Sequence, residues 1–277
     1  MQKNIQSRFD FITLFFWFFL ALSAITRTVL LVKSIDMINF SLVELLKIYL
    51  VGAFYDFITV SYIVLPFVIY LLCLPQKVLK HKIHHYGTYI FIYFLLFGAI
   101  FYAFSEWFFW DEFSVRFNFI AVDYLIYTKE VIGNIKESYP IGTLLSVIAF
   151  ITSLFLYIIY KSNYVANFLK DESKLKQRFK PALIYFLIPM ISFAGVTEDF
   201  AKISTNQYSN ELAKSGLYSL FAAFRNNSLD YDVFYLCDNE ENVFSNLKKS
   251  TKTNNSAFLN SNDITRNIVN SGEEKDY

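Results

Sequence analysis

Ionisable side chains inside apolar stretches are the first candidates for chemistry in this sequence. Arg27 lies within the first such stretch and Asp56 within the second. A charged group at that depth in lipid costs about 3 kcal/mol or more, so it tends to face a helix-bundle interior or a polar cavity. We expect Arg27 and Asp56 to line a lipid-headgroup or structural polar site between helices. The alternative for Arg27 is that its side chain reaches the nearby outer surface.

A second set of candidates follows the third apolar stretch, where aromatic rings and acids stand side by side. Such a mixture at the end of an apolar stretch is typical of a membrane–water interface. Because charge is readily solvated there, an ordinary interfacial position is the alternative for each residue, and a contact to a lipid headgroup is the functional interpretation. These candidates are Glu106, Glu112, Arg116 and Asn118.

Other constellations that could do chemistry are weak or missing from the sequence. His81, His84 and His85 have a spacing that could bring three imidazoles together on a metal, but a solvated basic loop is the favoured interpretation. There is no histidine after His85 and no GxSxG, P-loop or GxGxxG motif. We therefore assign no catalytic residue, metal ligand or cofactor to this chain.

Composition places the chain among membrane proteins. Of its 277 residues, 55% are hydrophobic and 18% are charged, and the apolar residues are gathered into long runs. The net charge of +1, without a basic stripe that carries stacking aromatics, argues against nucleic acid as a partner. The fold class that we predict is an all-α integral membrane protein.

Five stretches are apolar enough to be transmembrane helices, which need about 20 residues each. Together they predict a transmembrane domain over residues 1–197. The last stretch is the shortest and contains Pro189, so its ends are the least defined. The five predicted spans cover residues 11–32, 46–74, 88–105, 141–160 and 182–196.

Three further segments lie outside these spans. Apolar residues recur at three- and four-residue steps over residues 112–136, which predicts an amphipathic helix in the interface. Residues 198–247 predict a helical connector, and residues 248–277 read as a polar linker. Lysine and arginine are concentrated in the connections around residues 75–87 and 161–180, so the N-terminus is expected in the cytoplasm and the C-terminus outside.

Several residues, taken in order and spacing, resemble a known family over nearly the whole chain. They are Gly52 and Asp56 in the second span, Glu106, Glu112, Arg116, Asn118 and Phe119 after the third, Asn210, Glu211, Leu212 and Gly216 after the fifth, and several positions over residues 227–235. The pattern resembles the membrane half of the lipoteichoic acid synthase and phosphoglycerol transferase family. The catalytic half of that family belongs to the alkaline-phosphatase/sulfatase superfamily.

The resemblance implies a function for the whole enzyme. It would move a phosphoglycerol or phosphoethanolamine group from a membrane phospholipid onto an outer-surface glycan or glycolipid, at the bacterial cytoplasmic membrane. A catalytic domain would supply a threonine nucleophile and the ligands for a divalent metal, Mn, Mg or Zn. That domain is missing from this sequence, so we expect a truncated chain, or one half of an enzyme with a separately encoded catalytic domain, that is inactive by itself.

Two functions from other classes stay open. The chain could be a structural or assembly membrane protein that docks an external partner through residues 199–235. A small transporter subunit is less favoured, because the five predicted spans show no internal repeat and Arg27 and Asp56 are the two deep charges available for a pathway.

Overall fold

The computed structural model divides the chain into two compact units, Met1–Asn226 and Asn227–Tyr277, which are described separately. Apart from one short hairpin in the second unit, the regular elements of the described chain are helices. The described residues are 8–38, 41–162, 164–165, 171–226 and 238–269.

Four helices of the first unit are long and apolar enough to cross a membrane. Their apolar side chains are largely exposed to the surroundings, as expected for helices that contact lipid. The prediction of a helical membrane protein is therefore confirmed at this level. The four helices are α1 (Asp10–Lys33), α2 (Leu42–Cys73), α4 (Lys82–Phe113) and α7 (Ile141–Lys161).

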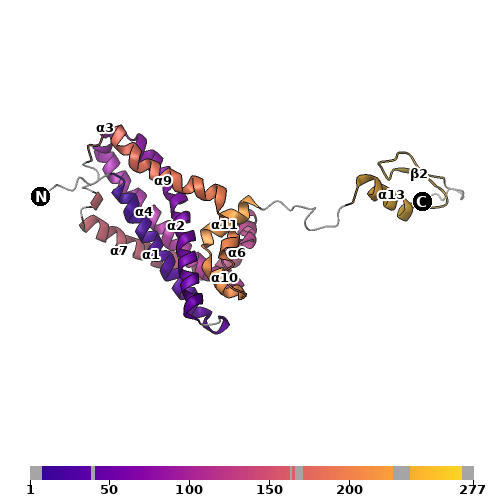
Figure 1. Cartoon of the computed structure of the whole chain (residues 1–277), viewed down its shortest axis with the longest axis horizontal. Coiled ribbons are helices and arrows are strands. Elements are labelled where there is room, and N and C mark those ends of the chain that lie inside the picture. Colours follow the sequence, from indigo (N-terminus) through magenta and orange to yellow (C-terminus); the bar gives the residue numbers. More distant parts are fainter. Residues whose placement is uncertain (1–7, 39–40, 163, 166–170, 227–237, 270–277) are drawn as a thin grey trace. The chain divides into compact units, whose positions relative to one another are not determined.

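The fifth predicted span corresponds to α9 (Leu175–Gly195), which runs beside α2 (Figure 1). Its first turns carry Lys176, Arg178 and Lys180, so the helix as a whole is less apolar than the other four. Within the described residues four helices meet the length and hydropathy expected of a span, and α9 is not among them.

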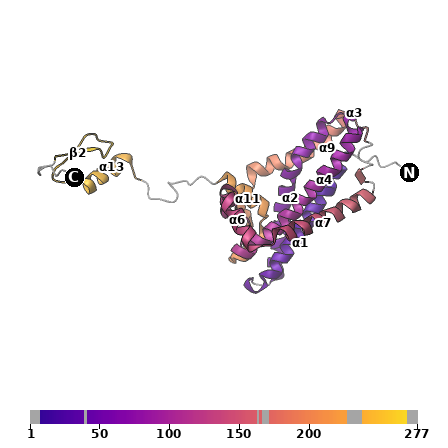
Figure 2. The same cartoon turned by 180° about the vertical axis from the view of Figure 1, so that it is seen from behind.

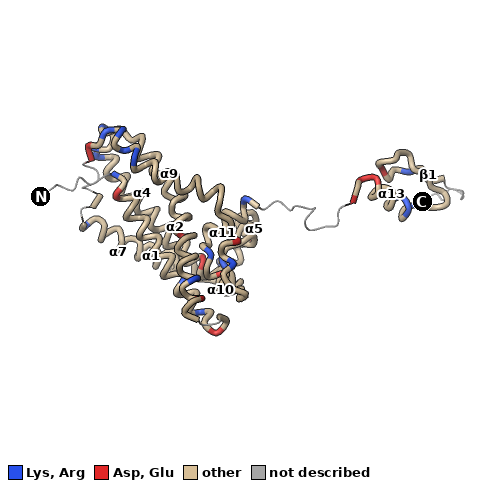
Figure 3. The backbone as a smooth tube through the Cα atoms, in the orientation of Figure 1, with Lys and Arg blue, Asp and Glu red and all other residues tan. Residues whose placement is uncertain are grey.

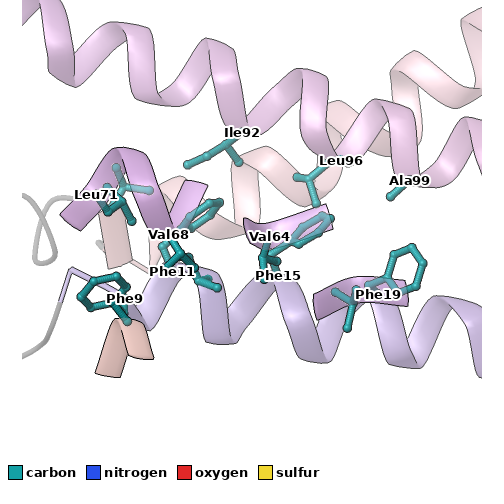
Figure 4. Close-up of a cluster of buried hydrophobic side chains, with 14 of the residues drawn as sticks. Phe9, Phe11, Phe15, Phe19, Val64, Val68, Leu71, Ile92, Leu96 and Ala99 are labelled. Carbon is teal, nitrogen blue, oxygen red and sulfur yellow. The ribbon is translucent and has the colours of Figure 1, made fainter. Parts of the chain in front are cut away.

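The centre of the bundle is an aromatic stripe on α1. Phe11, Phe15 and Phe19 are four residues apart, which places their rings on one helical face. Figure 4 shows this stripe facing side chains of α2 and α4. Its main partners are Val64, Val68 and Leu71 on α2 and Ile92, Leu96 and Ala99 on α4.

Short elements join the long helices at the two ends of the bundle. At one end η1 (Ile35–Met37) leads into α2, whose N-terminus is capped by Ser41. At the other end α3 (Gln76–Leu79) joins α2 to α4. Figure 2, seen from behind, shows α3 at the end opposite to α6 and α11.

The predicted amphipathic helix over residues 112–136 is two helices. The chain leaves α4 after Phe113 through Ser114, whose backbone is left-handed with φ of 56°. The side chain of Asn118 then accepts a hydrogen bond from the Ile120 N–H and starts a new helix. The elements that follow are α5 (Phe119–Ile126) and α6 (Thr128–Ser138).

The first part of the predicted connector is folded against the membrane helices. It consists of η2 (Glu198–Ala201), α10 (Gln207–Ala213) and α11 (Gly216–Arg225), which pack on α1, α2 and α5. Leu212 is fully buried in one cluster with Leu30, Ile48 and Trp110. Residues 227–237 of the predicted connector lie outside the described residues.

The second unit includes residues 248–269 of the segment predicted as a polar linker, and part of that segment has regular structure. It contains α13 (Glu240–Thr251), capped by Asn239, and an antiparallel hairpin of β1 (Ser256–Phe258) and β2 (Arg266–Ile268). The Lys248 ammonium donates to the carbonyl oxygen of Ser261 at 2.6 Å, so a polar side chain ties the helix to the hairpin loop. The composition of this segment did not indicate the helix and the hairpin, because the contact between them is polar. Residues 270–277 lie outside the described part.

Candidate functional site

Arg27 and Asp56 form an ion pair inside the bundle. The guanidinium Nη2 of Arg27 donates to Asp56 Oδ2, and both side chains are almost completely buried. Gly52 lies one turn before Asp56 on α2, and a β carbon at Gly52 would overlap the Arg27 guanidinium. Arg27 therefore does not extend to the surface, and Gly52 provides the space that it occupies.

Arg27 also binds the end of α10. Its Nη1 donates to the carbonyl oxygen of Leu212 at 2.7 Å and to that of Lys214 at 3.1 Å. A cation beside the last carbonyls of a helix satisfies acceptors that have no partner within that helix and interacts favourably with its dipole. One membrane helix thus caps a helix that follows it by about 180 residues.

A second buried pair joins α4 to the loop after it. The Arg116 Nη1 donates to Glu106 Oε1, and both side chains are 1% exposed. The left-handed turn at Ser114 sends the chain back along α4, so that Arg116 meets a residue ten positions earlier. Burial lowers the pKa of Arg116, but Glu106, Tyr102 and Asp56 together outweigh burial, and the pKa is raised.

Glu106 faces the start of α11. A β carbon at Gly216, the first residue of α11, would overlap the Glu106 carboxylate. The hydroxyl of Tyr102, one turn before Glu106 on α4, accepts a hydrogen bond from the Leu217 N–H at 3.3 Å. A carboxylate is favoured near a helix N-terminus, where the peptide N–H groups point outward.

Glu211 and Lys214 complete the group. Glu211 Oε2 accepts from the backbone N–H of Arg116 at 3.0 Å, and its Oε1 accepts from Lys214 Nζ at 2.6 Å. We call these six residues the charge cluster, and their formal charges sum to zero. The charge cluster consists of Arg27, Asp56, Glu106, Arg116, Glu211 and Lys214.

Several polar atoms of the charge cluster have no partner. Among the described residues, Asp56 Oδ1, Glu106 Oε2 and both Nε and Nη2 of Arg116 are buried and make no hydrogen bond within the chain. The hydroxyls of Ser209 on α10 and Ser219 on α11 are likewise buried without a hydrogen-bond partner in the described chain. Buried polar atoms of this kind are normally satisfied by ordered water or by a ligand.

The predicted site residues are thus only partly brought together. Arg27, Asp56, Glu106 and Arg116 meet in the charge cluster. Asn118 caps α5, and Glu112 is exposed on α4 outside the cluster. Glu211 and Lys214 were not among the predicted site residues, although Glu211 is one of the residues that carry the family resemblance.

A different buried pair, which no sequence pattern indicated, lies at the opposite end of the bundle. Arg8 Nε donates to Asp171 at 2.7 Å, and Arg8 and Arg178 both donate to the carbonyl oxygen of Leu74, just after α2. Burial raises the pKa of Asp171, but hydrogen bonds from Ser173 and Arg8 outweigh it and hold the pKa below its ordinary value. This arrangement caps α2.

The three histidines have separate partners. His81 accepts from the Ile83 N–H and caps α4, His84 shares a hydrogen bond with the Tyr70 hydroxyl, and His85 stacks edge-on with Tyr89. In the described part of the chain no three His, Cys, Asp or Glu side chains lie together as metal ligands.

In comparisons with known proteins, no family model, no curated protein and no solved structure matches this chain. The candidate site is therefore defined by the geometry of its own residues.

Proposed function

We propose that this chain is the membrane-anchoring half of a sulfatase-type phosphoglycerol or phosphoethanolamine transferase. In this proposal it holds the outer connector and a phospholipid headgroup in a fixed place on the outer face of a bacterial cytoplasmic membrane. The charge cluster is the observation that carries the proposal. It joins residues from three motifs that carry the family resemblance, around Asp56, Glu106 and Glu211.

The contacts within the charge cluster explain why these residue types occur together. Gly52 makes room for Arg27, and Gly216 makes room for Glu106. Glu211 receives the backbone N–H of Arg116. Residues that match a family only by chance are not expected to contact one another, whereas residues of one functional unit are. The contacts therefore support the resemblance independently of the sequence pattern.

The proposal includes α9 as a fifth crossing and a defined orientation. Figure 3 shows Lys and Arg gathered at the end of the bundle that holds α3 and the start of α9. The positive-inside rule favours the cytoplasm for that end. The charge cluster, near α10 and α11, would then lie toward the outer face. The basic residues in question are Lys77, Lys80, Lys82, Lys174, Lys176 and Lys180.

The amphipathic α6 fits the same orientation. Its apolar side chains include Ile132 and Ile135, which are exposed, and none of its side chains is fully buried. The helix lies between the end of α4 and the start of α7, which would hold it at the outer interface. The nucleophile and the divalent metal of such an enzyme are expected on a catalytic domain, and we assign no catalytic step to this chain.

A chimera tests the proposal. Residues 1–269 are joined to the catalytic domain of a phosphoethanolamine transferase, in cells that lack their own enzyme. The control carries the same catalytic domain on one unrelated transmembrane helix. We expect the chimera to transfer several times more phosphoethanolamine than the control, and Glu106→Ala in the chimera to remove that advantage. Equal output from chimera and control would reduce the chain to a plain anchor and would contradict headgroup presentation.

Reporter fusions test the orientation separately. A reporter after Asn226 should be active outside the cytoplasm, and one inserted before Lys174 should be active inside. The reverse pattern would overturn the orientation. A correct orientation with an inactive chimera would instead favour the role of a structural membrane protein with an external partner.

A further inference from the structure

We propose that the charge cluster binds a zwitterionic phosphate ester, in which a phosphate group carries a primary ammonium group on a short spacer. The free edge of Arg116 would hold the phosphate oxygens, and the free carboxylate oxygens of Asp56 and Glu106 would hold the ammonium. The inference rests on the lipid-presenting part of the proposed function and gives the chemistry of the headgroup.

The donor side of this site is the guanidinium of Arg116. Its Nη1 is occupied by Glu106, whereas Nε and Nη2 are buried without a partner in the described part of the chain. These two N–H groups form the side edge of the guanidinium, which matches two oxygens of a phosphate in a bidentate contact. Leaving charged donors buried and unsatisfied is costly, so a bound oxyanion would remove a penalty that the chain alone carries.

The acceptor side is supplied by two carboxylates. Asp56 and Glu106 each give one oxygen to an arginine, and each keeps one buried oxygen without a partner among the described residues. Asp56 interacts electrostatically with Arg116 and Glu106 as well as with Arg27, so the two pairs form one group. A primary ammonium has three N–H donors and can serve both free oxygens.

Charge balance selects among phosphate esters. The three cations and three anions of the charge cluster cancel, and a zwitterion keeps that balance in a buried place. An anionic headgroup such as phosphoglycerol would add an uncompensated charge. A quaternary ammonium has no N–H to donate to the carboxylates.

Lys214 is the most exposed member of the charge cluster, so in this proposal the headgroup enters from its side. Its side chain is 24% exposed and bonds Glu211, which in turn bonds the backbone of Arg116. Lys214 has a long flexible side chain, and in this proposal it moves aside to admit the headgroup.

Lipid binding by the purified full chain tests the inference. The chain is loaded with an equal mixture of phosphatidylethanolamine, phosphatidylcholine and phosphatidylglycerol, and the retained lipids are measured by native mass spectrometry. We expect phosphatidylethanolamine to be retained about tenfold over the other two. Soluble phosphoethanolamine and inorganic phosphate are added as competitors. If neither competitor displaces the lipid, the site binds a lipid headgroup. If phosphoethanolamine displaces the lipid and inorganic phosphate does not, the site binds a free phosphate ester of the same chemistry.

Two variants and a matched control locate the site. Arg116→Lys keeps the positive charge but loses the bidentate edge, and we expect about tenfold weaker retention of phosphatidylethanolamine. Arg225→Lys, at an exposed arginine that lies over the Phe193 ring, should leave retention unchanged. Asp56→Asn leaves the cluster with a charge of +1 and should shift the preference toward phosphatidylglycerol. If Arg116→Lys does not fold, the lipid preference of the wild type and of Asp56→Asn still decides.

Equal retention of the three lipids by the wild type would mean that water alone satisfies the free atoms, and it would overturn the inference. The same holds if Arg116→Lys and Arg225→Lys behave alike. If the chimera is inactive but the chain still retains phosphatidylethanolamine selectively, only the transferase proposal is contradicted. If the chimera is active but lipid retention is not selective, only this inference is contradicted.

Discussion

Gly216 lies so close to Glu106 that a single added carbon would overlap the carboxylate. The contact joins the first residue of α11 to a membrane helix, and it puts a negative charge at the positive end of α11. The position of α11 on the bundle therefore depends on the absence of a side chain at one residue.

Gly216→Ala should weaken the attachment of α11. The β carbon must push Glu106 or the helix aside, and overpacking of this kind costs about 1–3 kcal/mol. A lower thermal unfolding midpoint and faster proteolysis near residue 226 would measure the effect. Gly98→Ala is the control, because a β carbon at Gly98 meets nothing within 4 Å, so alanine should be neutral or slightly stabilising there. Equal behaviour of the two variants would contradict the role of the contact.

Removing one partner of the Arg27–Asp56 pair should cost more than removing both. Asp56→Leu leaves a buried guanidinium unpaired and should destabilise the fold by about 3–5 kcal/mol. Arg27→Met combined with Asp56→Leu should recover part of that loss, although Leu212 and Lys214 then lose their donor. The free energies of unfolding of Arg27→Met, Asp56→Leu and the double variant give the coupling energy. Additive values would contradict an interaction between the two side chains.

Asp171 predicts a pH dependence at the other end of the bundle. Its folded pKa is lowered below the ordinary 3.8, so the ion pair with Arg8 stabilises the fold above that pH. The stabilisation is lost as the pH falls through the folded pKa. The wild type should therefore unfold at a higher temperature than Asp171→Asn near neutral pH, and the two midpoints should converge in acid. A constant difference across the whole range would be the contrary result.

The apolar face of α6 should be shielded by lipid. In a chain with Cys73 and Cys237 replaced, Ile135→Cys should react slowly with a charged maleimide in intact membranes. Glu137→Cys, on the opposite face, should react quickly, and both should react quickly in detergent-free denaturant. Equal rates in membranes would place α6 away from the interface.

The apolar part of the fold could be predicted from the sequence. Long apolar runs require helices in lipid, and α1, α2, α4 and α7 lie where four of those runs predict them. The deep positions of Arg27 and Asp56 already indicated a polar site between helices. Their pairing follows because a buried charge needs a partner.

The remaining contacts depend on geometry that no local pattern reveals. The left-handed turn at Ser114 occurs at a residue without special preference for it, and it decides that Arg116 faces Glu106. Arg8 and Asp171 are separated by 163 residues and neither lies in an apolar run. Asn118 was predicted as a headgroup contact from its position after the third span, whereas in the structure its side chain caps α5.

The partners of Arg27 become available in a fixed order while the chain is being synthesised. During synthesis Arg27 meets Asp56 after only 29 more residues, but the carbonyl of Leu212 emerges 185 residues after Arg27. Throughout that interval Arg27 has one of its three hydrogen-bond partners and lacks the carbonyl oxygens of Leu212 and Lys214. Completion of the membrane helices is therefore a late event, which is finished by a segment that follows them all.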